Sequence, residues 1–283
     1  MTSSNSGKLW IVATPLGNLG DLSPRAREIL ASVDFVLAED TRRSGILLSS
    51  CGIAAKRFIS LHDHNERAKL TAVLTELQTG GMAALISDAG TPLISDPGYQ
   101  LVKACREAGI AVSPLPGPSA PLAALSASGL PPLPFIFLGF PPRSKGDIRN
   151  FFMPYAGLDT TIIFFERKDR LADTLALAHE VLGERLGCIA REMTKTFEEF
   201  IPFSLDAGIK DIFKGRELLG EITVVLGPPK TPLLTSEADV LAIIQEQKEI
   251  FPEEKPRTIA RRVQKLVSGW TVDAVYDLLR HAQ

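Results

Sequence analysis

Short apolar runs without polar alternation recur through the first half of the chain, at 9–13, 35–38, 83–86 and 111–115. A half-exposed strand alternates apolar and polar residues, whereas a strand covered on both faces is apolar throughout. Helical patterns lie between these runs, at 24–30, 66–78 and 97–108. This alternation of strand and helix predicts a mainly parallel sheet with helices on both faces.

Capping residues indicate where two of these helices begin and end. Ser23 followed by Pro24 predicts a helix start, because serine caps the free N–H groups of a first turn and proline needs no partner there. Asp96 and Pro97 predict the start of the later helix in the same way, and Gly109 predicts its end.

Two proline-rich segments, 130–134 and 227–232, divide the chain into three parts. Between them, the apolar pattern predicts strands at 135–138, 160–165, 186–190 and 221–226, an antiparallel strand at 197–203, and helices at 148–153 and 171–182. Beyond the second segment, apolar residues from Val240 to Leu279 follow helical spacing alone.

We therefore expect an α/β fold class, with two α/β domains built on mainly parallel or mixed sheets and a small C-terminal helical domain. The expected parts are a disordered tail at 1–7, a first domain at 8–130, a second domain at 131–228 and a helical module at 233–283.

Composition limits the class of protein further. With 283 residues, of which 45% are hydrophobic, the chain can bury the cores of two domains. The formal net charge of -2 excludes a general polycation, so any contact with nucleic acid must come from a local basic patch. Cys51, Cys105 and Cys188 are odd in number and far apart, which argues against a disulfide framework and a zinc site. No signal peptide or membrane span is apparent, so we expect a cytoplasmic protein with no membrane association and no metal.

Four loops follow predicted strands, at 14–21, 87–92, 114–120 and 165–167. Open parallel sheets bind ligands at the carboxyl ends of their strands. Gly17, Gly20, Gly90 and Gly117 would let the backbone approach a ligand, although any one of these loops by itself is more often a plain turn. The first loop lacks G-x-G-x-x-G and the chain lacks a P-loop, which disfavours a dinucleotide enzyme and a nucleoside triphosphatase.

Several longer segments resemble, in order, the signatures of one family. They are 11–19, 38–42, 61–66, 87–99 and 114–119, followed by 164–166 with Arg170, 190–195 and 220–223. Together they are similar to the ribosomal RNA small-subunit methyltransferase I family, a branch of the tetrapyrrole methylase-like, class III methyltransferases. The sequence departs from the expected pattern at Pro141-Pro142 and at 167–170, which affects the detail of the loop that follows Glu166.

The resemblance implies S-adenosyl-L-methionine as cofactor, held in the cleft between the two α/β domains. Its implied cofactor-binding residues are Pro15, Leu16, Gly17, Asp88, Ala89, Gly90, Ser119, Ala120, Phe165, Glu166, Arg191 and Thr223. The implied reaction is 2′-O-methylation of a cytidine in small-subunit (16S) ribosomal RNA. The implied partner is that RNA or the small ribosomal subunit, and we also expect a homodimer.

Methylation of a ribose hydroxyl needs a base or a polarising cation near the oxygen. The polar clusters at 39–42 and 62–65 supply the candidates Asp40, Arg42 and His64. The second cluster could equally cap the helix that begins at Glu66, and a metal site at His62 and His64 is a weaker alternative because further ligands are missing. Arg42 and Arg43 could also clamp phosphates of the RNA.

The helical module carries a basic segment that contains no acidic residue. Its cations are Lys255, Arg257, Arg261, Arg262 and Lys265, and a glycine-containing turn and a further helix follow them. This pattern is typical of small nucleic-acid-binding units, although a dimerisation or lid module would read the same. We interpret the segment as an RNA contact. Two other functions stay open: C-methylation of a corrin precursor, and a non-catalytic RNA-binding assembly factor.

Overall fold

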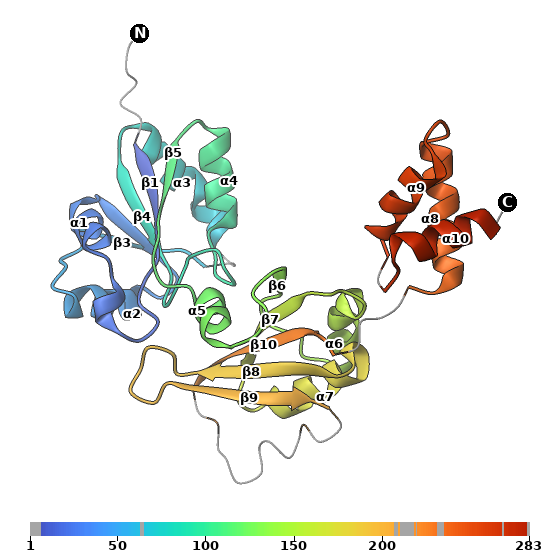
Figure 1. The fold of residues 1–283 in the computed structure, drawn as a ribbon. Coiled ribbons are helices and arrows are strands. Elements are labelled where there is room, and N and C mark those ends of the chain that lie inside the picture. Colours follow the sequence, from blue (N-terminus) through green and yellow to red (C-terminus); the bar gives the residue numbers. More distant parts are fainter. Residues whose placement is uncertain are drawn as a thin grey trace.

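The computed structural model describes residues 7–62, 65–206, 209, 218, 220–230, 235–267 and 269–281. They form two α/β domains and a bundle of three helices (Figure 1). Gly7, which the sequence assigned to the disordered tail, is buried and donates its backbone N–H to the Leu77 carbonyl at 2.8 Å. The rest of that predicted tail and the candidate base His64 lie outside the described residues.

The first domain is built on a five-stranded parallel sheet. Its strands are β1 (Lys8–Val12), β2 (Phe35–Ala38), β3 (Phe58–Ser60), β4 (Met82–Ile86) and β5 (Ala111–Leu115), in the order β3-β2-β4-β1-β5. Separate apolar clusters cover its two faces. The predicted parallel sheet is therefore confirmed, and the apolar runs mark four of its strands. The short strand β3 was missed because it is only partly buried.

Helices cover both faces of this sheet: α1 (Pro24–Ser32), α2 (Thr41–Ser50), α3 (Glu66–Gln78) and α4 (Tyr99–Glu107), with a 3-10 turn η1 (Leu19–Asp21). Ser23 caps α1 as expected, accepting the Ala26 N–H at 3.2 Å. The predicted start of α4 at Pro97 was wrong. The helix starts at Tyr99, because Gly98 takes a φ of 122° that no helix allows and residues before it form an irregular loop.

The helix that follows β5 changes domain. In α5 (Ala120–Ala127), Ala124 and Leu125 pack against Ile163, Cys188 and Val225 of the second sheet. The predicted boundary at residue 130 therefore lies too late, because this helix belongs to the second core. The sequence does not predict which sheet α5 packs on, because a helix that is apolar on all sides has no single face that marks its partner.

The second domain is built on a mixed sheet in the order β6-β7-β10-β8-β9. The strands are β6 (Phe135–Phe137), β7 (Thr161–Arg167), β8 (Arg185–Arg191), β9 (Glu199–Leu205) and β10 (Glu221–Pro229), and only the β6–β7 pair is parallel. The predicted antiparallel strand is β9. The predicted break at Gly227 was wrong, since β10 continues through a bulge to Pro229. The helices α6 (Lys145–Phe152) and α7 (Leu171–Leu182), with the 3-10 turn η2 (Met153–Tyr155), complete the domain.

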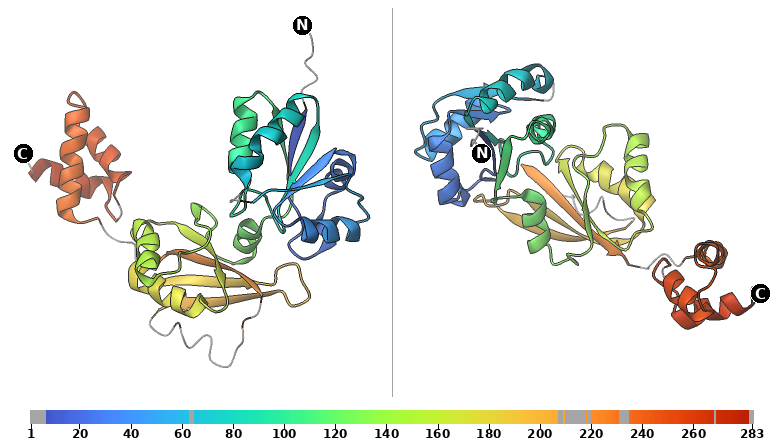
Figure 2. Two further views of the ribbon diagram at one scale, coloured as in Figure 1. Left: turned by 180° about the vertical axis from the view of Figure 1, so that it is seen from behind. Right: turned by 90° about the horizontal axis from the view of Figure 1, so that it is seen from above.

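The C-terminal module contains α8 (Glu237–Ile250), α9 (Pro256–Gln264) and α10 (Val272–His281). Its buried side chains, such as Val240, Ile259 and Val275, form an apolar cluster that includes no residue of the two sheets. Figures 1 and 2 show the module apart from both α/β domains. Within the part of the chain that the structure describes, no helix is both long and apolar enough to cross a membrane.

Candidate active site

Three loops meet at the carboxyl ends of β1, β4 and β5. The backbones of Thr14 and Gly90 form an isolated antiparallel bridge, with N···O distances of 2.8 and 3.0 Å. The Thr14 hydroxyl donates to the Ser87 carbonyl at 3.0 Å, and the Thr91 hydroxyl donates to the Pro118 carbonyl at 2.9 Å. These hydrogen bonds fix the three loops relative to one another, and the loops form one wall of a cavity.

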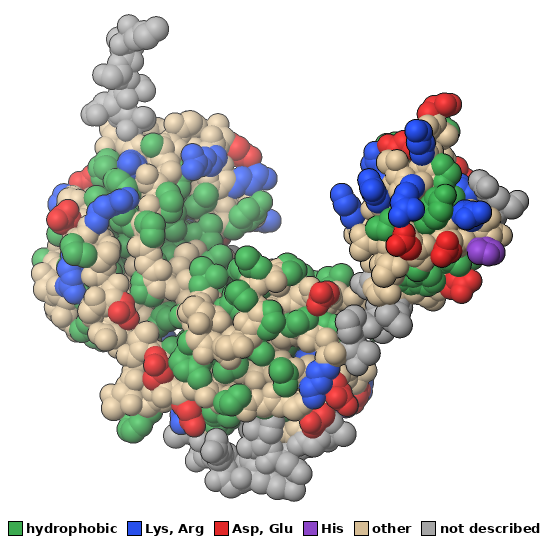
Figure 3. All heavy atoms as spheres, in the orientation of Figure 1, with side chains coloured by type: hydrophobic (Ala, Val, Ile, Leu, Met, Phe, Trp, Pro, Cys, Tyr) green, Lys and Arg blue, Asp and Glu red, His purple; other side chains and the backbone are tan. Residues whose placement is uncertain are grey.

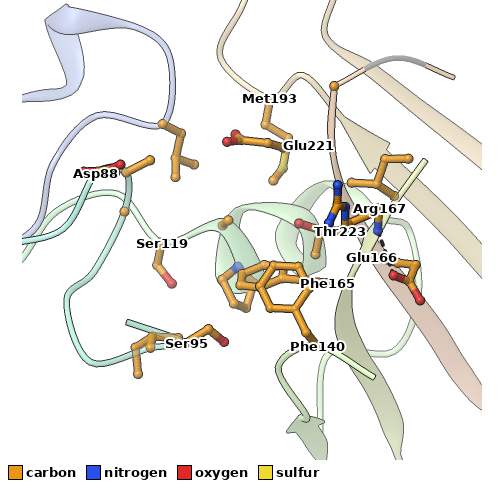
Figure 4. A pocket seen from close by; sticks show the side chains of 18 of the residues that line it. Asp88, Ser95, Ser119, Phe140, Phe165, Glu166, Arg167, Met193, Glu221 and Thr223 are labelled. Carbon is orange, nitrogen blue, oxygen red and sulfur yellow. Dashed lines mark hydrogen bonds between the residues drawn. The ribbon is translucent and has the colours of Figure 1, made fainter. Parts of the chain in front are cut away.

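The second domain supplies the opposite wall. Phe165 and Thr223 are direct partners in the β7–β10 register, and Met193 comes from the loop between β8 and β9. The Phe165 ring packs on Phe140 at 5.2 Å between centroids. Figure 4 shows these side chains around one cavity of about 510 Å³, within the range of small-molecule sites.

Most of the cofactor residues implied by the family resemblance line this cavity: Leu16, Asp88, Ala89, Gly90, Ser119, Ala120, Phe165, Glu166 and Thr223. Pro15, Gly17 and Arg191 are not among the lining residues. Arg191 instead pairs with Glu199 at 2.7 Å across the β8–β9 ladder, so its position argues against a cofactor contact.

Polar and apolar side chains both line the cavity, and one of the polar groups is unsatisfied. Asp88 Oδ2 accepts a hydrogen bond from Arg43 Nη1 at 3.1 Å, whereas Asp88 Oδ1 is buried and has no hydrogen-bond partner among the described residues. A buried carboxylate oxygen without a donor is costly, so it favours a ligand that donates one. Apolar neighbours such as Leu16, Met193 and Ile222 suit an uncharged stem and an aromatic ring. The acceptor oxygen and the apolar neighbours therefore fit S-adenosylmethionine, which carries an ammonium and ribose hydroxyls as donors, and an adenine ring.

Glu166 lines the cavity, but its carboxylate serves the fold. Its Oε2 accepts a hydrogen bond from the Thr174 hydroxyl at 2.5 Å and lies 3.5 Å from the Arg170 guanidinium, while Oε1 accepts the Arg167 N–H at 2.8 Å. The side chain is fully buried and ties the end of β7 to α7. A cofactor contact would come from its backbone.

We predict that Glu166→Gln weakens the fold and spares the site. Loss of the charge-assisted bonds should destabilise the protein by about 2 kcal/mol, measured by urea denaturation. The dissociation constant of the cofactor, measured by calorimetry, should stay within about threefold. A large loss of affinity at unchanged stability would show that the carboxylate itself holds the ligand.

The candidate catalytic residues Asp40 and Arg42 lie beside a second, shallower hollow with Glu39, Thr41, Ser60 and His62. Asp40 caps α2, and its Oδ1 accepts the N–H groups of Arg42 and Arg43 at 2.9 and 3.2 Å. These backbone hydrogen bonds hold the pKa of Asp40 below its ordinary value, which makes it a poorer proton acceptor. A catalytic role for Asp40, Arg42 or His64 remains a prediction.

The cluster at 62–65 directly precedes α3, but Asn65, at the N-cap position, makes no side-chain hydrogen bond to that helix. Asn65 Oδ1 accepts the His62 N–H at 2.9 Å, and the buried Glu66 carboxylate accepts the Leu101 N–H at 2.9 Å. These bonds hold the loop before α3 and join α3 to α4, so the described residues do not support the alternative interpretation of a side-chain cap.

Sequence reasoning missed several lining residues, among them Phe140, Lys168, Met193 and Glu221. Phe140 is half exposed beside the cavity and could have been suspected, because an exposed aromatic side chain after a strand often contacts a ligand. The place of Met193 depends on a long hairpin between β8 and β9, which no local pattern predicts.

Comparisons with known proteins agree with this geometry. The family model described as Tetrapyrrole (Corrin/Porphyrin) Methylases matches residues 8–207. A protein named Ribosomal RNA small subunit methyltransferase I from Escherichia coli O157:H7 is 44% identical over 265 residues, which cover 92% of this chain and 91% of that protein. A protein of the same name from Thermotoga maritima is 44% identical over 220 residues, which cover 78% of this chain and 98% of that protein. The solved methyltransferase CobJ has a TM-score of 0.60 at 19% identity and covers 81% of this chain and 98% of its own.

The two α/β domains with a cavity between their loops have the fold of the solved methyltransferase CobJ, and the matched family model identifies the chain as a methylase. The chain belongs to the tetrapyrrole (corrin/porphyrin) methylase family and, within it, to the ribosomal RNA small subunit methyltransferase I family. Proteins of this kind depend on S-adenosylmethionine, so the chain is an S-adenosylmethionine-dependent methyltransferase.

Proposed function

We propose that the chain transfers a methyl group from S-adenosylmethionine to the ribose 2′-oxygen of a cytidine in small-subunit ribosomal RNA. The observation that carries this proposal is the 44% identity to a ribosomal RNA small subunit methyltransferase I over 92% of the chain. Free thiols at Cys51, Cys105 and Cys188 support the reducing, cytoplasmic compartment in which such RNA is found.

The residues that line the cavity suggest that the two domains bind different parts of the cofactor. Asp88 would accept hydrogen bonds from the cofactor through its unpaired Oδ1, and Gly90 would bring the backbone against it. Phe165 and Met193 would cover the apolar parts of the cofactor from the other side. When bound, the cofactor supplies an electrophilic methyl group, and the protein has to place the hydroxyl oxygen in line with it.

The test is to incubate the purified chain and labelled S-adenosylmethionine with small subunits from a strain that lacks the corresponding methyltransferase. Mass spectrometry of RNA digests should find one new 2′-O-methylcytidine. Methylation of a corrin precursor and not of RNA would favour the tetrapyrrole alternative. Failure to bind the cofactor in calorimetry would favour the non-catalytic assembly factor.

We also propose that the helical module contacts RNA, through part of its basic segment. Arg257, Arg261 and Lys265 are exposed and four residues apart, which places them along one side of α9. Figure 3 shows several Lys and Arg side chains on the surface of this module. We call these three residues the basic stripe.

In the folded module, two arginines of the basic segment form ion pairs with carboxylates, so they are less available for RNA. Arg262 pairs with Glu254 through two hydrogen bonds, at 2.7 and 2.6 Å, and its guanidinium lies over the Phe251 ring. Arg257 pairs with Asp273 at 2.9 Å. Within the described residues, Arg261 and Lys265 have no ion pair, so these two are the strongest candidates for phosphate contacts.

We predict that the double variant Arg261→Gln, Lys265→Gln lowers the salt dependence of RNA binding. Each lost phosphate contact should reduce the slope of log affinity against log salt by about 0.7 to 0.9, which filter binding at several salt concentrations can measure. Arg149→Gln with Lys230→Gln removes two ion-paired cations elsewhere and serves as the control. An unaltered slope in the stripe variant would point to a dimerisation or lid module.

The homodimer expected from the sequence stays a prediction. Sedimentation equilibrium of the full chain checks it, and a monomer at micromolar concentration would contradict it.

A further inference from the structure

The loop between β8 and β9 brings a lysine to the edge of the cavity. Lys195 lies two residues after the lining residue Met193, and its side chain packs on Gly17, the neighbour of the lining residue Leu16. Its Nζ lies 3.6 Å from Glu221 Oε2, and Glu221 also lines the cavity. In Figure 4, Met193 and Glu221 project into the cavity from the same edge. Lys195 therefore contacts Gly17 of the first domain and lies beside the lining residue Glu221 of the second.

Two carboxylates hold this lysine in place. Glu192 Oε1 accepts a hydrogen bond from Lys195 Nζ at 3.1 Å, and Glu221 Oε2 lies 3.6 Å from the same nitrogen. Glu192 is mostly buried, whereas Glu221 is largely exposed to the cavity and solvent. Burial lowers the pKa of Lys195, but the hydrogen bond that its ammonium donates to Glu192 and the charges of both carboxylates outweigh this effect and raise the pKa overall. Lys195 is thus a fixed cation at neutral pH, able to donate hydrogen bonds but not to accept a proton.

Two glycines make room for this arrangement. A Cβ at Gly17 would lie 2.3 Å from Lys195 Cγ, and a Cβ at Gly220 would lie 1.9 Å from Glu192 Oε1. The backbone also takes unusual conformations there, with a φ of 49° at Glu192 and 65° at Thr194. Non-glycine residues at positive φ cost free energy and persist where the surroundings impose them. The position of Lys195 is therefore built by both domains and does not reflect a chance surface contact.

Resting on the proposed function, we propose that Lys195 and Glu221 activate the acceptor hydroxyl. The Lys195 ammonium donates a hydrogen bond to the ribose oxygen and stabilises the negative charge that develops on it. As the O–H bond breaks, its proton passes to a Glu221 carboxylate oxygen and the oxygen's electron pair forms the bond to the methyl carbon. The pair of the broken S–CH₃ bond stays on sulfur, whose positive charge is lost.

Lys195 and Glu221 are better placed to activate the acceptor hydroxyl than Asp40, which lies beside the second hollow. Asp40 is engaged as a helix cap with a lowered pKa, and it does not line the main cavity. Lys195 and Glu221 combine a cation and a carboxylate at the cavity edge, where an acceptor can approach from solvent.

The test compares Lys195→Met, Lys195→Arg and the control Lys103→Met, which removes an exposed lysine from α4. In single-turnover methylation of small subunits at saturating cofactor, Lys195→Met should be slower by about 10²- to 10³-fold. Lys195→Arg, which keeps the charge, should lose less than about tenfold, and Lys103→Met should match the wild type. The dissociation constant of the cofactor should change less than about threefold in all three variants.

A second readout needs no turnover. In the cofactor-free protein, NMR of labelled lysine side chains should place the pKa of Lys195 above its ordinary value of 10.5, and Glu221→Gln should lower it. A Lys195→Met rate within threefold of the wild type at saturating cofactor would overturn the inference, and a weaker cofactor affinity of that variant would then assign Lys195 to cofactor binding. A wild-type chain that methylates no ribosomal RNA would overturn the proposed function and the inference together.

Discussion

Gly90→Val should weaken S-adenosylmethionine binding at least tenfold, about 1.4 kcal/mol. Gly90 has a φ of 81°, a conformation that a β-branched residue adopts only under strain, and its backbone bridges to Thr14. A Cβ there would lie 3.2 Å from Leu16 Cδ2, on the wall of the cavity. Valine should therefore occupy cofactor space and shift the loop that carries Asp88. Calorimetry gives the affinity, and circular dichroism checks that the fold is kept.

Gly109→Val is the matched control for this substitution. Gly109 follows α4 with a φ of 70°, and nothing lies within 4 Å of its missing Cβ, so valine there brings similar backbone strain without filling the cavity. The control should lose stability and keep its cofactor affinity. Equal affinities for the Gly90→Val variant and the wild type would remove this loop from the cofactor site.

The parts of the fold that depend on local patterns could be predicted from the sequence. Four strands of the first sheet were found because burial on both faces leaves an uninterrupted apolar run, and α3 and α7 match their predicted limits. The parts that depend on distant contacts could not. The start of α4 is set by the conformation of Gly98, and the packing of α5 on the second sheet depends on residues far along the chain.

The candidate site divides in the same way. Loops at strand ends, such as those at Asp88 and Ser119, were predictable because parallel sheets gather them at one edge. The roles of individual charges were not, since they depend on partners that only folding supplies. Glu166 accepts a hydrogen bond from Thr174. Arg191 forms an ion pair with Glu199, and Arg262 donates a hydrogen bond to Glu254.

Arg185 is the clearest case of a charge whose role only the fold explains, and its loss should have the largest effect on stability. It is the first residue of β8, fully buried, and outside the strand that the sequence predicted. Burial lowers its pKa, which the charge of Asp159 partly offsets. Its guanidinium donates hydrogen bonds to the Gly227 carbonyl, at the bulge in β10, at 3.0 Å. It also donates to four backbone carbonyls that precede β7: Thr160 at 3.0 Å, Tyr155 at 3.2 Å, Ala156 at 3.3 Å and Leu158 at 3.4 Å.

Arg185→Met should therefore destabilise the second domain by about 3 to 5 kcal/mol, because several buried carbonyls lose their donor at once. Urea denaturation of the full chain measures this. Arg149→Met, which removes an exposed arginine paired with Glu180, should cost less than about 1 kcal/mol. An Arg185→Met variant as stable as the wild type would mean that water or a local rearrangement satisfies these carbonyls. If the loss is found, the effect should reach the active site, since the segment that Arg185 holds leads directly into β7, which carries Phe165 to the cavity.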